Sequence, residues 1–508
     1  MQTICLIKPP SLHKGISFAR MATPPLGLAI IASAIQSKGY NIQIIDSTGE
    51  KPNQFYSFNG FSAHGLDFEE IASKIDSKTN IFCVSLMFSS NWLLDRELIS
   101  FLKIKFPNCS FIGGGEHATA LPEICIESGL DYIVLGEGDS TIIELIKALE
   151  MNLSVDSIDG IVYKKNNNYV RTQPKKRIQQ IDSLPFVDWD LFPVKNYFLH
   201  EMTYGVAIGK TLPILASRGC PYECTFCSSP QMWGRNYYVN DVNLIVNLME
   251  TYNAKYGVTN FDFYDLTALI KRDWIIDLCK EIINRKLNIT FQLPSGTRSE
   301  AIDNEVAKYL FQSGCRFVSY APESGSVKVL RETKKKVKIK SMLKSINQSN
   351  KAGLNVKLNM ILGFPHDTHR DIWLTFWFLI KCSWHGANDA APAIFSPYPG
   401  TQLYKELLEK KWVNPNEDSY YEDLLNSYDI IPNKTYCFNI SKNWLRVYIF
   451  IFLLFFYGSN YLFRPWRFFK LITNVMRKKQ TSRLEQLIIT NLFRPMKYKF
   501  LRLVKSKA

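Results

Sequence analysis

Residues 217–227 read SRGCPYECTFC and place Cys220, Cys224 and Cys227 in a C-x3-C-x2-C arrangement on one short loop. Thiolates are the usual ligands of iron–sulfur clusters, and a loop of this length can curl three sulfurs around one cubane. A [4Fe–4S] cluster held in this way leaves its fourth iron open to a small ligand. A three-cysteine zinc site is the alternative, although a structural zinc site needs a fourth Cys or His and the loop contains none.

The sequence that follows this loop alternates strand and helix patterns. Apolar runs bounded by turn residues predict six strands, at residues 212–217, 260–264, 289–293, 317–320, 355–362 and 393–397. Helical patterns separate these strands, so the segment predicts a full or partial TIM-type barrel of about six βα units. The active site of such a barrel is built at the carboxyl ends of its strands, and the cysteine loop follows the first strand.

The first 150 residues show the same alternation. Strands are expected at residues 3–8, 41–46, 81–86, 109–113 and 132–135, and helices at 26–38, 68–76, 92–106 and 141–149. This α/β pattern predicts a doubly wound, Rossmann-like parallel sheet, in which ligands bind beyond the carboxyl ends of the strands. Two glycine-rich turns lie at such ends, GGGEH at 113–117 and GEG at 136–138. Ordinary tight turns would also explain these glycines.

The whole chain of 508 residues, 46% of them apolar and 13% aromatic, is long enough for about three folded units. We expect an N-terminal domain at residues 1–150, a linker at 151–205, the barrel at 206–410 and a C-terminal helical extension at 411–508. The eleven cysteines are scattered, and no secretory pattern is visible at the N-terminus. These features argue against a disulfide framework and indicate a reducing cytoplasm.

Positive charge and apolar residues are both concentrated near the C-terminus. Residues 464–508 hold 13 Lys or Arg and one acid, Glu485, and so account for most of the net charge of +15. Residues 447–457, VYIFIFLLFFY, are apolar or aromatic, but spanning a bilayer needs about 20 residues. Mixed aromatic and basic residues favour a helix lying peripherally on the inner face of an anionic membrane. The alternatives are packing on the barrel and a true span.

The cysteine loop resembles the signature of the radical SAM superfamily, in which an aromatic residue, here Phe226, precedes the last cysteine. The resemblance implies that S-adenosylmethionine (SAM) binds the open iron through its amine and carboxylate. One electron then cleaves SAM to a 5′-deoxyadenosyl radical, so a reducing partner such as flavodoxin or ferredoxin is implied as well. The protein's share of this chemistry is to position the cofactors and to exclude water.

Further motifs of the second domain continue this resemblance: DFYD at residues 262–265, YAPESGS at 320–326, GFP at 363–365 and PYPGT at 397–401. By resemblance, Glu323 and Ser324 hold polar parts of SAM, and Asp265 and Gly363 belong to the same site. Arg298 is a candidate clamp for the SAM carboxylate, because a guanidinium pairs with a carboxylate through two parallel hydrogen bonds. Each has a simpler alternative: a helix cap, a turn or a surface residue.

The N-terminal domain resembles the cobalamin-binding domain that precedes the barrel in one large class of radical SAM enzymes. The matching residues are PPLGL at 24–28, GGGEHAT at 113–119, DY at 131–132 and GEG at 136–138. The resemblance implies cobalamin contacts from Gly114, His117, Gly136 and Glu137. The Asp-x-His-x-x-Gly motif that supplies a histidine ligand to cobalt elsewhere is missing, so cobalamin is expected without that ligand. A domain that has lost cobalamin is the alternative, and His117 could instead cap the next helix.

These features lead to a radical SAM enzyme, with cobalamin-dependent methylation of an unactivated carbon as the leading hypothesis. The substrate is expected to be a small molecule, and a lipid-like one if the tail contacts membrane. A ring-forming or carbon–carbon bond-forming enzyme is the first alternative. A structural metal-binding module with a nucleic-acid-binding tail is the second, but the tail carries no nucleic-acid recognition motif, so no nucleic-acid partner is expected.

Overall fold

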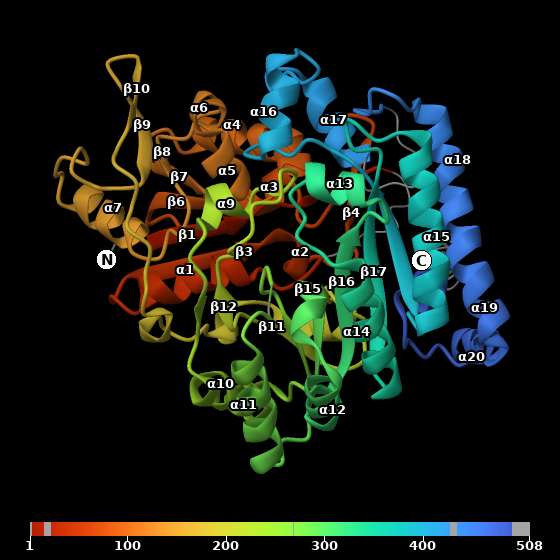
Figure 1. The fold of residues 1–508 in the computed structure, drawn as a ribbon. Helices are drawn as coiled ribbons and strands as arrows, with labels where there is room; N and C mark the ends of the chain where they lie inside the picture. Colours follow the sequence, from red (N-terminus) through yellow and green to blue (C-terminus); the bar gives the residue numbers. More distant parts are fainter. Residues whose placement is uncertain (1–2, 15–21, 268, 427–433, 490–508) are drawn as a thin grey trace, which may run out of the picture.

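The computed structural model describes residues 3–14, 22–267, 269–426 and 434–489. They form two parallel-sheet units that face each other and a layer of helices along one side of the second unit. In Figure 1 the N-terminal sheet is red to orange, the barrel is green to cyan, and the C-terminal helices form a blue layer beside α15 (His369–His385). The predicted α/β class, with a parallel N-terminal sheet followed by a partial barrel and a helical extension, is confirmed.

The N-terminal sheet has seven strands in the order β10-β9-β8-β7-β6-β1-β3. They are β1 (Thr3–Lys8), β3 (Asn41–Asp46), β6 (Thr79–Ser85), β7 (Ser110–Gly114), β8 (Tyr132–Val134), β9 (Ile161–Lys165) and β10 (Asn168–Arg171). The five neighbouring strands β8, β7, β6, β1 and β3 pair in parallel, whereas β9 and β10 add an antiparallel hairpin. This hairpin comes from the segment expected as a linker, so the sheet continues beyond residue 150.

Helices cover both faces of this sheet, which is why its strands are apolar on both sides. They are α1 (Leu26–Gln36), α2 (Ser47–Glu50), α3 (Phe68–Lys74), α4 (Trp92–Lys105), α5 (Glu116–Ala120), α6 (Pro122–Glu127) and α7 (Thr141–Glu150). In β1, Cys5, Leu6 and Ile7 are fully buried. A small antiparallel sheet of β2 (Ser11–His13), β5 (Phe61–His64) and β4 (Phe55–Phe58) lies beside it.

The connection between the sheets packs against both. It contains β9, β10, the 3-10 turns η2 (Ile181–Ser183) and η3 (Trp189–Leu191), and α8 (Val194–Leu199). Trp189 is fully buried, and the hydroxyl of Tyr197 donates to the Asp46 carboxylate at 2.7 Å. The connection is therefore an ordered part of the domain interface.

The barrel is a six-stranded parallel sheet in the order β11-β14-β15-β16-β17-β18, which does not close on itself. Its strands are β11 (Thr211–Ile214), β14 (Asn260–Phe263), β15 (Thr290–Thr297), β16 (Cys315–Glu323), β17 (Asn355–Leu362) and β18 (Asp389–Ile394). A short ladder of β12 (Ser217–Arg218) with β13 (Tyr238–Val239) follows β11. On β17, Val356, Leu358, Met360 and Leu362 are buried against helices, so the alternate residues face the barrel interior.

Helices cover the outside of the barrel. They are α10 (Val242–Tyr256), α11 (Arg272–Asn284), α12 (Asn304–Gln312), α14 (Ile339–Lys351) and α15. The short α9 (Ser229–Trp233) contacts α5 of the N-terminal domain, and η4 (Ser299–Ala301), α13 (Val327–Glu332) and α16 (Gln402–Glu409) follow other strands of the barrel. The buried stripes of the outer helices follow helical spacing, as in α12 with Val306, Ala307 and Leu310.

Residues 442–463 of the C-terminal extension pack along α15, whereas its first helix, at residues 418–426, contacts the N-terminal domain (Figure 1). The elements of the extension are α17 (Asp418–Asn426), α18 (Lys442–Leu453), the π-helical turn η5 (Leu454–Gly458), α19 (Ser459–Phe463) and α20 (Pro465–Met476). Leu445, Phe452 and Phe456 are fully buried, which explains why this apolar run folds onto the barrel next to β18. Residues 490–508 of the basic tail lie outside the described residues.

Candidate active site

The cysteine loop lies between β12 and α9, at the carboxyl end of the first barrel strand. Gly219 has a φ of +90°, and a Cβ at this position would collide with the carbonyl oxygen of Asn236, so glycine is required. Within the loop the amide of Cys227 donates to the carbonyl of Cys224 at 3.1 Å. The local backbone therefore curls the three thiols together where barrel active sites are built.

The three thiols of the loop are more accessible than most other cysteines in the chain. Cys220, Cys224 and Cys227 are half-buried, whereas seven of the other eight cysteines are buried. Their contacts with protein are weak: the Cys220 sulfur lies 3.7 Å from the Thr267 hydroxyl, and the Cys227 thiol donates to the Ser229 hydroxyl at 3.1 Å. The loop thus presents three thiols without a strong protein partner.

This donor set fits an iron–sulfur cubane better than one zinc ion. In the described parts of the chain, no three His, Cys, Asp or Glu side chains converge on the position of a single metal ion. A structural zinc site takes four such ligands, whereas a cubane can be held by three cysteines with one iron left open. Burial raises the pKa of Cys224 to about 11, against the opposing charge of Lys335. Iron would supply the positive charge that keeps this sulfur a thiolate.

Glu323, a predicted SAM residue, lies beside the cysteine loop. It ends β16 with a φ of +65°, a left-handed conformation that costs about 1–3 kcal/mol in a residue other than glycine. Its carboxylate accepts a hydrogen bond from the Lys335 ammonium at 3.0 Å, and this nitrogen lies 5.8 Å from the centre of the Phe226 ring. The charge of Lys335 acts on Cys224 as well. The Glu323 carboxylate, on a strained backbone, and the Lys335 ammonium therefore lie next to the thiols.

Arg298 also contacts the loop. Its guanidinium carbon lies 4.0 Å from the centre of the Tyr222 ring, and the group donates to the carbonyl of Lys336. Glu300 forms an ion pair with it at 3.3 Å. The side chain is 11% exposed and packs over the loop, so it is not a free surface residue.

Asp265 stabilises the start of the loop. It is 1% exposed and accepts hydrogen bonds from the amide of Ala216 at 3.2 Å and from the hydroxyl of Ser217. Burial raises its pKa to about 6, although these hydrogen bonds favour the charged form. Its contacts order the turn from β11 to β12 and cap no helix; a contact with SAM stays a prediction.

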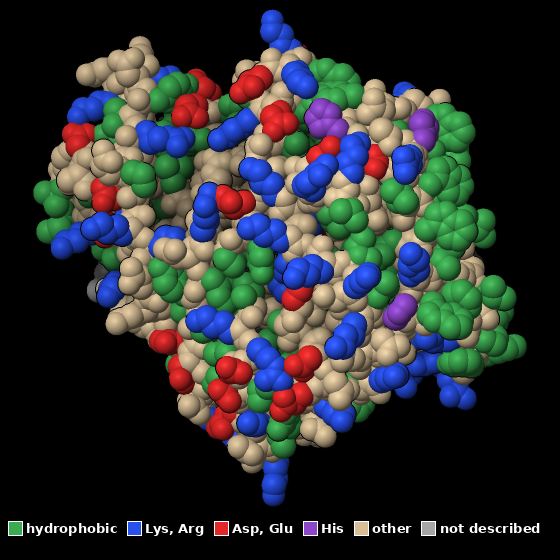
Figure 2. Space-filling model, viewed as in Figure 1, with side chains coloured by type: hydrophobic (Ala, Val, Ile, Leu, Met, Phe, Trp, Pro, Cys, Tyr) green, Lys and Arg blue, Asp and Glu red, His purple; other side chains and the backbone are tan. Residues whose placement is uncertain are grey.

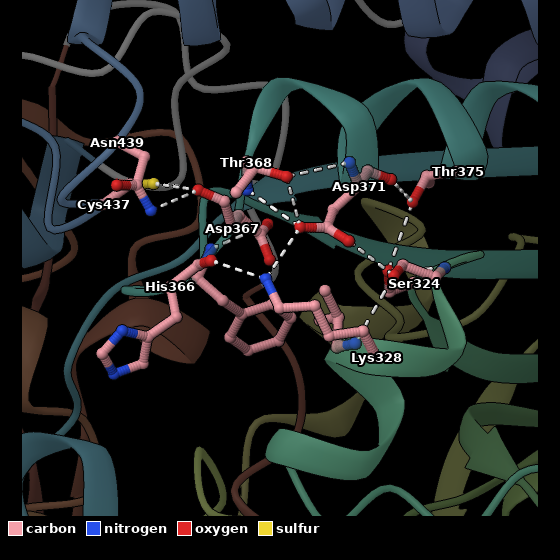
Figure 3. A network of polar contacts seen from close by, with 12 residues as sticks. Ser324, Lys328, His366, Asp367, Thr368, Asp371, Thr375, Cys437 and Asn439 are labelled. Atoms are coloured by element: carbon pink, nitrogen blue, oxygen red, sulfur yellow. Dashed lines mark hydrogen bonds and ion pairs between the residues drawn. The ribbon is translucent and has the colours of Figure 1, made fainter.

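Ser324 belongs to a polar network that joins the barrel to its outer helices (Figure 3). Its hydroxyl lies 3.2 Å from that of Thr375 on α15 and accepts a hydrogen bond from the amide of Ser326 at 3.1 Å. Asp371 accepts from the Ser326 hydroxyl at 2.7 Å and from Lys328 at 3.2 Å. The Ser324 side chain therefore faces α15, and its predicted contact with SAM stays untested by this arrangement.

Gly363 holds the C-terminal extension against the barrel. Its φ is +80°, and a Cβ would lie 2.9 Å from a methyl carbon of Leu445 on α18. Its amide donates to the Asp367 carboxylate at 3.0 Å, and the Asp367 carbonyl accepts from Cys437 and Asn439 (Figure 3). Burial raises the pKa of Asp367 to about 7. In this structure the turn at Gly363 therefore packs the C-terminal extension against the barrel.

The predicted cobalamin turns face the helix that follows the cysteine loop. Ser228, just before α9, donates a hydrogen bond to the carboxylate of Glu116. A Cβ on Gly136 would lie 3.3 Å from the carbonyl of Met232, at a φ of +64°. Gly114, at the end of β7, has only ordinary contacts around a Cβ position. The carboxyl edges of the two sheets therefore meet at one interface.

Glu137 takes part in buried ion pairs across that interface. Arg177 binds its two carboxylate oxygens at 3.0 and 3.1 Å, and Arg218 lies 3.6 Å away. Arg218 also binds both oxygens of Asp139, at 2.7 and 3.0 Å, with 5% of each side chain exposed. Because Arg218 is two residues before Cys220, these pairs lock the N-terminal sheet to the cysteine loop.

His117 is a core residue of the N-terminal domain. Its side chain is 1% exposed, its Nδ1 lies 2.9 Å from the Ser89 hydroxyl, and its ring packs against Trp92 and Tyr421. It makes no helix-cap hydrogen bond, so the capping interpretation is wrong. Burial lowers its pKa to about 3, which keeps the ring neutral. A corrin contact by His117 stays a prediction that this burial disfavours.

The sequence patterns did not single out several residues that lie at the carboxyl edges of the two sheets or in the barrel interior. Met87 and Phe88 follow β6 at the carboxyl edge of the N-terminal sheet and are 41% and 59% exposed. Such open apolar side chains fit the face of a corrin ring. Lys335 lies between two other lysines, so the sequence did not distinguish it from its exposed neighbours. Lys357 on β17 faces the barrel interior, where burial and Arg483 lower its pKa to about 8; only the alternation of β17 could have indicated it.

Two comparisons with known families agree with this geometry. Residues 214–379 match the radical SAM superfamily, and residues 17–146 match the B12 binding domain. The chain is therefore a radical SAM enzyme with an N-terminal B12-binding domain. A [4Fe–4S] cluster, SAM and cobalamin are the cofactors of these two domains.

Individual proteins similar to this chain include methyltransferases and a cyclase. An uncharacterized methyltransferase of Pyrococcus horikoshii is 28% identical over 405 residues, 79% of this chain and 82% of that protein. An anaerobic magnesium-protoporphyrin IX monomethyl ester cyclase of Cereibacter sphaeroides is 25% identical over 410 residues, 79% of this chain and 63% of the cyclase. The fold matches the radical SAM methyltransferase TsrM from Kitasatospora setae, solved with cobalamin and a [4Fe–4S] cluster, with a TM-score of 0.64, 17% identity and coverage of 81% of this chain and 75% of that chain.

Proposed function

We propose that this protein methylates an unactivated carbon of a small-molecule or lipid-like substrate by radical chemistry. The observation that carries the proposal is the meeting of the two sheet edges, where Arg218 beside the cysteine loop binds Asp139 and where Gly136 contacts α9. When bound, the cluster with SAM supplies a radical that activates the substrate carbon, and cobalamin supplies the methyl group. The similarity to a methyltransferase over 79% of the chain supports this choice.

The protein's own residues hold and orient these groups. Cys220, Cys224 and Cys227 would hold the cluster, with the Glu323 carboxylate and the Lys335 ammonium beside it. A carboxylate and a cation are suited to the amine and carboxylate of the methionine part of SAM. The buried ion pairs Arg218–Asp139 and Arg177–Glu137 hold the N-terminal sheet next to the cysteine loop.

Ring formation is the second candidate. The similarity to the cyclase favours it, because that relative also matches 79% of this chain. The two reactions differ in the fate of the SAM methyl group, which appears in the product only in methylation. Deuterium in that methyl group therefore distinguishes them.

The decisive experiment is anaerobic reconstitution with iron and sulfide, followed by reduction with dithionite in the presence of SAM. We expect a [4Fe–4S] absorption spectrum and formation of 5′-deoxyadenosine, and absorbance of bound cobalamin in the same sample. A Cys224→Ala variant should lose both the cluster and 5′-deoxyadenosine completely. The matched control is Cys109→Ala, which removes a half-buried thiol outside the loop and should retain both. Absence of 5′-deoxyadenosine from the reconstituted wild-type protein would refute the proposal.

We also propose that this enzyme acts in the cytoplasm with peripheral membrane contact through its C-terminal extension. One stretch, Lys442–Phe463, is long and apolar enough to cross a membrane by length and composition. In the structure it runs through the π-helical turn η5 and one side packs on α15 of the barrel, so it is better suited to lie on a membrane than to cross it. Its outer side and the neighbouring helices expose Trp377, Phe450 and Trp466, at 59%, 61% and 62%.

The surroundings of this apolar surface suit an anionic bilayer. Figure 2 shows hydrophobic side chains gathered along the edge where α15, α18 and α20 lie in Figure 1. Residues 442–483 carry nine Lys or Arg and no Asp or Glu. Flotation with vesicles containing phosphatidylglycerol should carry the protein upward, and a Trp377→Ser/Trp466→Ser variant should float less. Equal flotation of both proteins would contradict membrane contact through this surface.

A further inference from the structure

A strongly basic segment follows β16, and most of its positively charged side chains have no role in the site described above. Residues 327–351 carry nine Lys or Arg and a single acid, Glu332. Seven of these cations are exposed, and five of the seven lie close together in residues 331–340: Arg331, Lys334, Lys336, Lys338 and Lys340. In Figure 2, blue side chains lie across the surface that α13 and α14 occupy in Figure 1. We call the five residues the basic face.

The basic face is attached directly to the cysteine loop. The carbonyl of Thr333 accepts a hydrogen bond from the amide of Thr225 at 3.1 Å, between Cys224 and Cys227 in the sequence. The carbonyl of Lys336 accepts from Arg298, whose guanidinium stacks on Tyr222 of the loop. The backbone that carries the exposed lysines is therefore the layer that covers the outer side of the loop.

Of the three consecutive lysines 334–336, only Lys335 points inward. Lys335 is 13% exposed and pairs with Glu323, whereas Lys334 and Lys336 on either side are exposed. The inward lysine belongs to the cofactor site, and the outward ones point to solvent just above it. The same short segment therefore connects the surface to the surroundings of Cys224.

Nearby acids do not neutralise the basic face. Glu300 is paired with Arg298 at 3.3 Å, and Glu223 of the loop is paired with Arg235. Glu332 is the one acid of the segment, which carries seven exposed cations. A net positive patch raises the local concentration of an acidic partner and speeds its encounter with the surface.

We propose that the basic face docks a small acidic electron-transfer protein of the flavodoxin or ferredoxin kind. The proposal rests on the proposed function, because only a radical SAM enzyme needs this electron. The donor loses one electron, and SAM gains it as its sulfonium C–S bond breaks to give methionine and a 5′-deoxyadenosyl radical. The position favours a redox partner over another acidic protein, since the patch covers the cysteine loop and lies apart from the interface of the two sheets.

The test compares two triple variants with the same change in charge. Lys334→Glu/Lys338→Glu/Lys340→Glu alters the basic face and leaves Lys335 and the carbonyl contact of Lys336 in place. Lys38→Glu/Lys147→Glu/Lys308→Glu alters three exposed lysines on α12 and the N-terminal domain. Each protein is reconstituted, and its affinity for a bacterial flavodoxin is measured by calorimetry at about 50 mM and about 300 mM salt. Formation of 5′-deoxyadenosine is measured with dithionite and, separately, with reduced flavodoxin.

We expect the basic-face variant to lose roughly tenfold or more in flavodoxin affinity at low salt and in flavodoxin-driven rate. Its dithionite-driven rate should equal that of the wild type, because a small reductant needs no docking surface. The control variant should match the wild type in all assays. Equal flavodoxin affinity of the two variants, or no binding of flavodoxin to the wild type, overturns the proposal. If the wild type forms no 5′-deoxyadenosine with dithionite, the proposed function is overturned instead.

Discussion

The carboxyl edges of the two sheets meet at one interface but use their side chains differently. The barrel edge presents three half-buried thiols whose contacts with protein are weak. The N-terminal edge, in contrast, commits its charged candidate Glu137 to Arg177 and Arg218. At the barrel edge the three thiols remain open to a cofactor, whereas at the N-terminal edge Glu137 binds the domains to each other.

This difference shows why residue type alone is a weak guide to ligands. A cysteine of this loop has few uses beyond metal binding, so its pattern predicts its chemistry. A carboxylate or histidine beside a glycine turn serves equally well in a ligand site, an ion pair or a core. Open backbone at Gly114 and the exposed side chains of Met87 and Phe88 are therefore the better candidates for contact with cobalamin.

The largest effect is expected at the ion pair that joins the two edges. Arg218→Ala leaves Asp139 buried without its cation, and breaking a buried pair from one side costs about 3–5 kcal/mol. Denaturant unfolding of the reconstituted protein measures this loss of free energy. Cobalamin affinity should fall as well, because the N-terminal edge is no longer held against the cysteine loop.

Arg96→Ala is the matched control for this prediction. Arg96 also binds both oxygens of an aspartate, Asp418, but the two side chains are 30% and 54% exposed. An exposed pair contributes only about 0–1 kcal/mol. Similar destabilisation by the two substitutions would mean that water reaches the Arg218–Asp139 pair at the interface between the two sheets.

The sequence predicted the barrel site better than its surroundings. The six barrel strands and the cysteine loop followed from apolar runs and thiol spacing, since both act locally along the chain. The hairpin β9–β10 could not be predicted, because its pairing with β8 is a long-range contact in a polar segment. The partners of Glu137 and Ser324 were equally hidden, because burial and ion pairs depend on which distant helices pack nearby.

An intermediate effect is expected at Gly363, where the barrel meets the extension. Alanine must adopt a φ of +80°, which costs about 1–2 kcal/mol, and its Cβ must displace the buried Leu445. We expect a loss of about 2 kcal/mol in the free energy of unfolding. Limited proteolysis should then cut more rapidly between α17 and α18.

Gly458→Ala provides the comparison within the extension. Gly458 is helical, with a φ of −59°, and a Cβ would lie no closer than 3.9 Å to its nearest neighbour. Alanine there should leave stability unchanged or raise it by about 0.5–1 kcal/mol. Equal destabilisation at both positions would show that Gly363 has no special role in docking α18.

The smallest effect on cofactor binding is expected at His117, which the N-terminal motif placed near cobalamin. Its ring is buried against Trp92, so His117→Gln should change cobalamin affinity by about twofold or less in an absorbance titration. A tenfold loss would instead place this residue on the corrin.

The same variant has a separate signature in acid. The folded-state pKa of His117, lowered to about 3 by burial, lies below its value of about 6.5 in the unfolded chain. The unfolded state therefore takes up a proton as the pH falls below about 6.5, and the wild type loses up to about 1.4 kcal/mol of stability per pH unit. Glutamine does not titrate, so the difference in unfolding free energy between the two proteins should shrink from pH 7 to pH 5. A constant difference would mean that the ring is open to protonation in the folded protein, as a residue exposed at a ligand-binding edge would be.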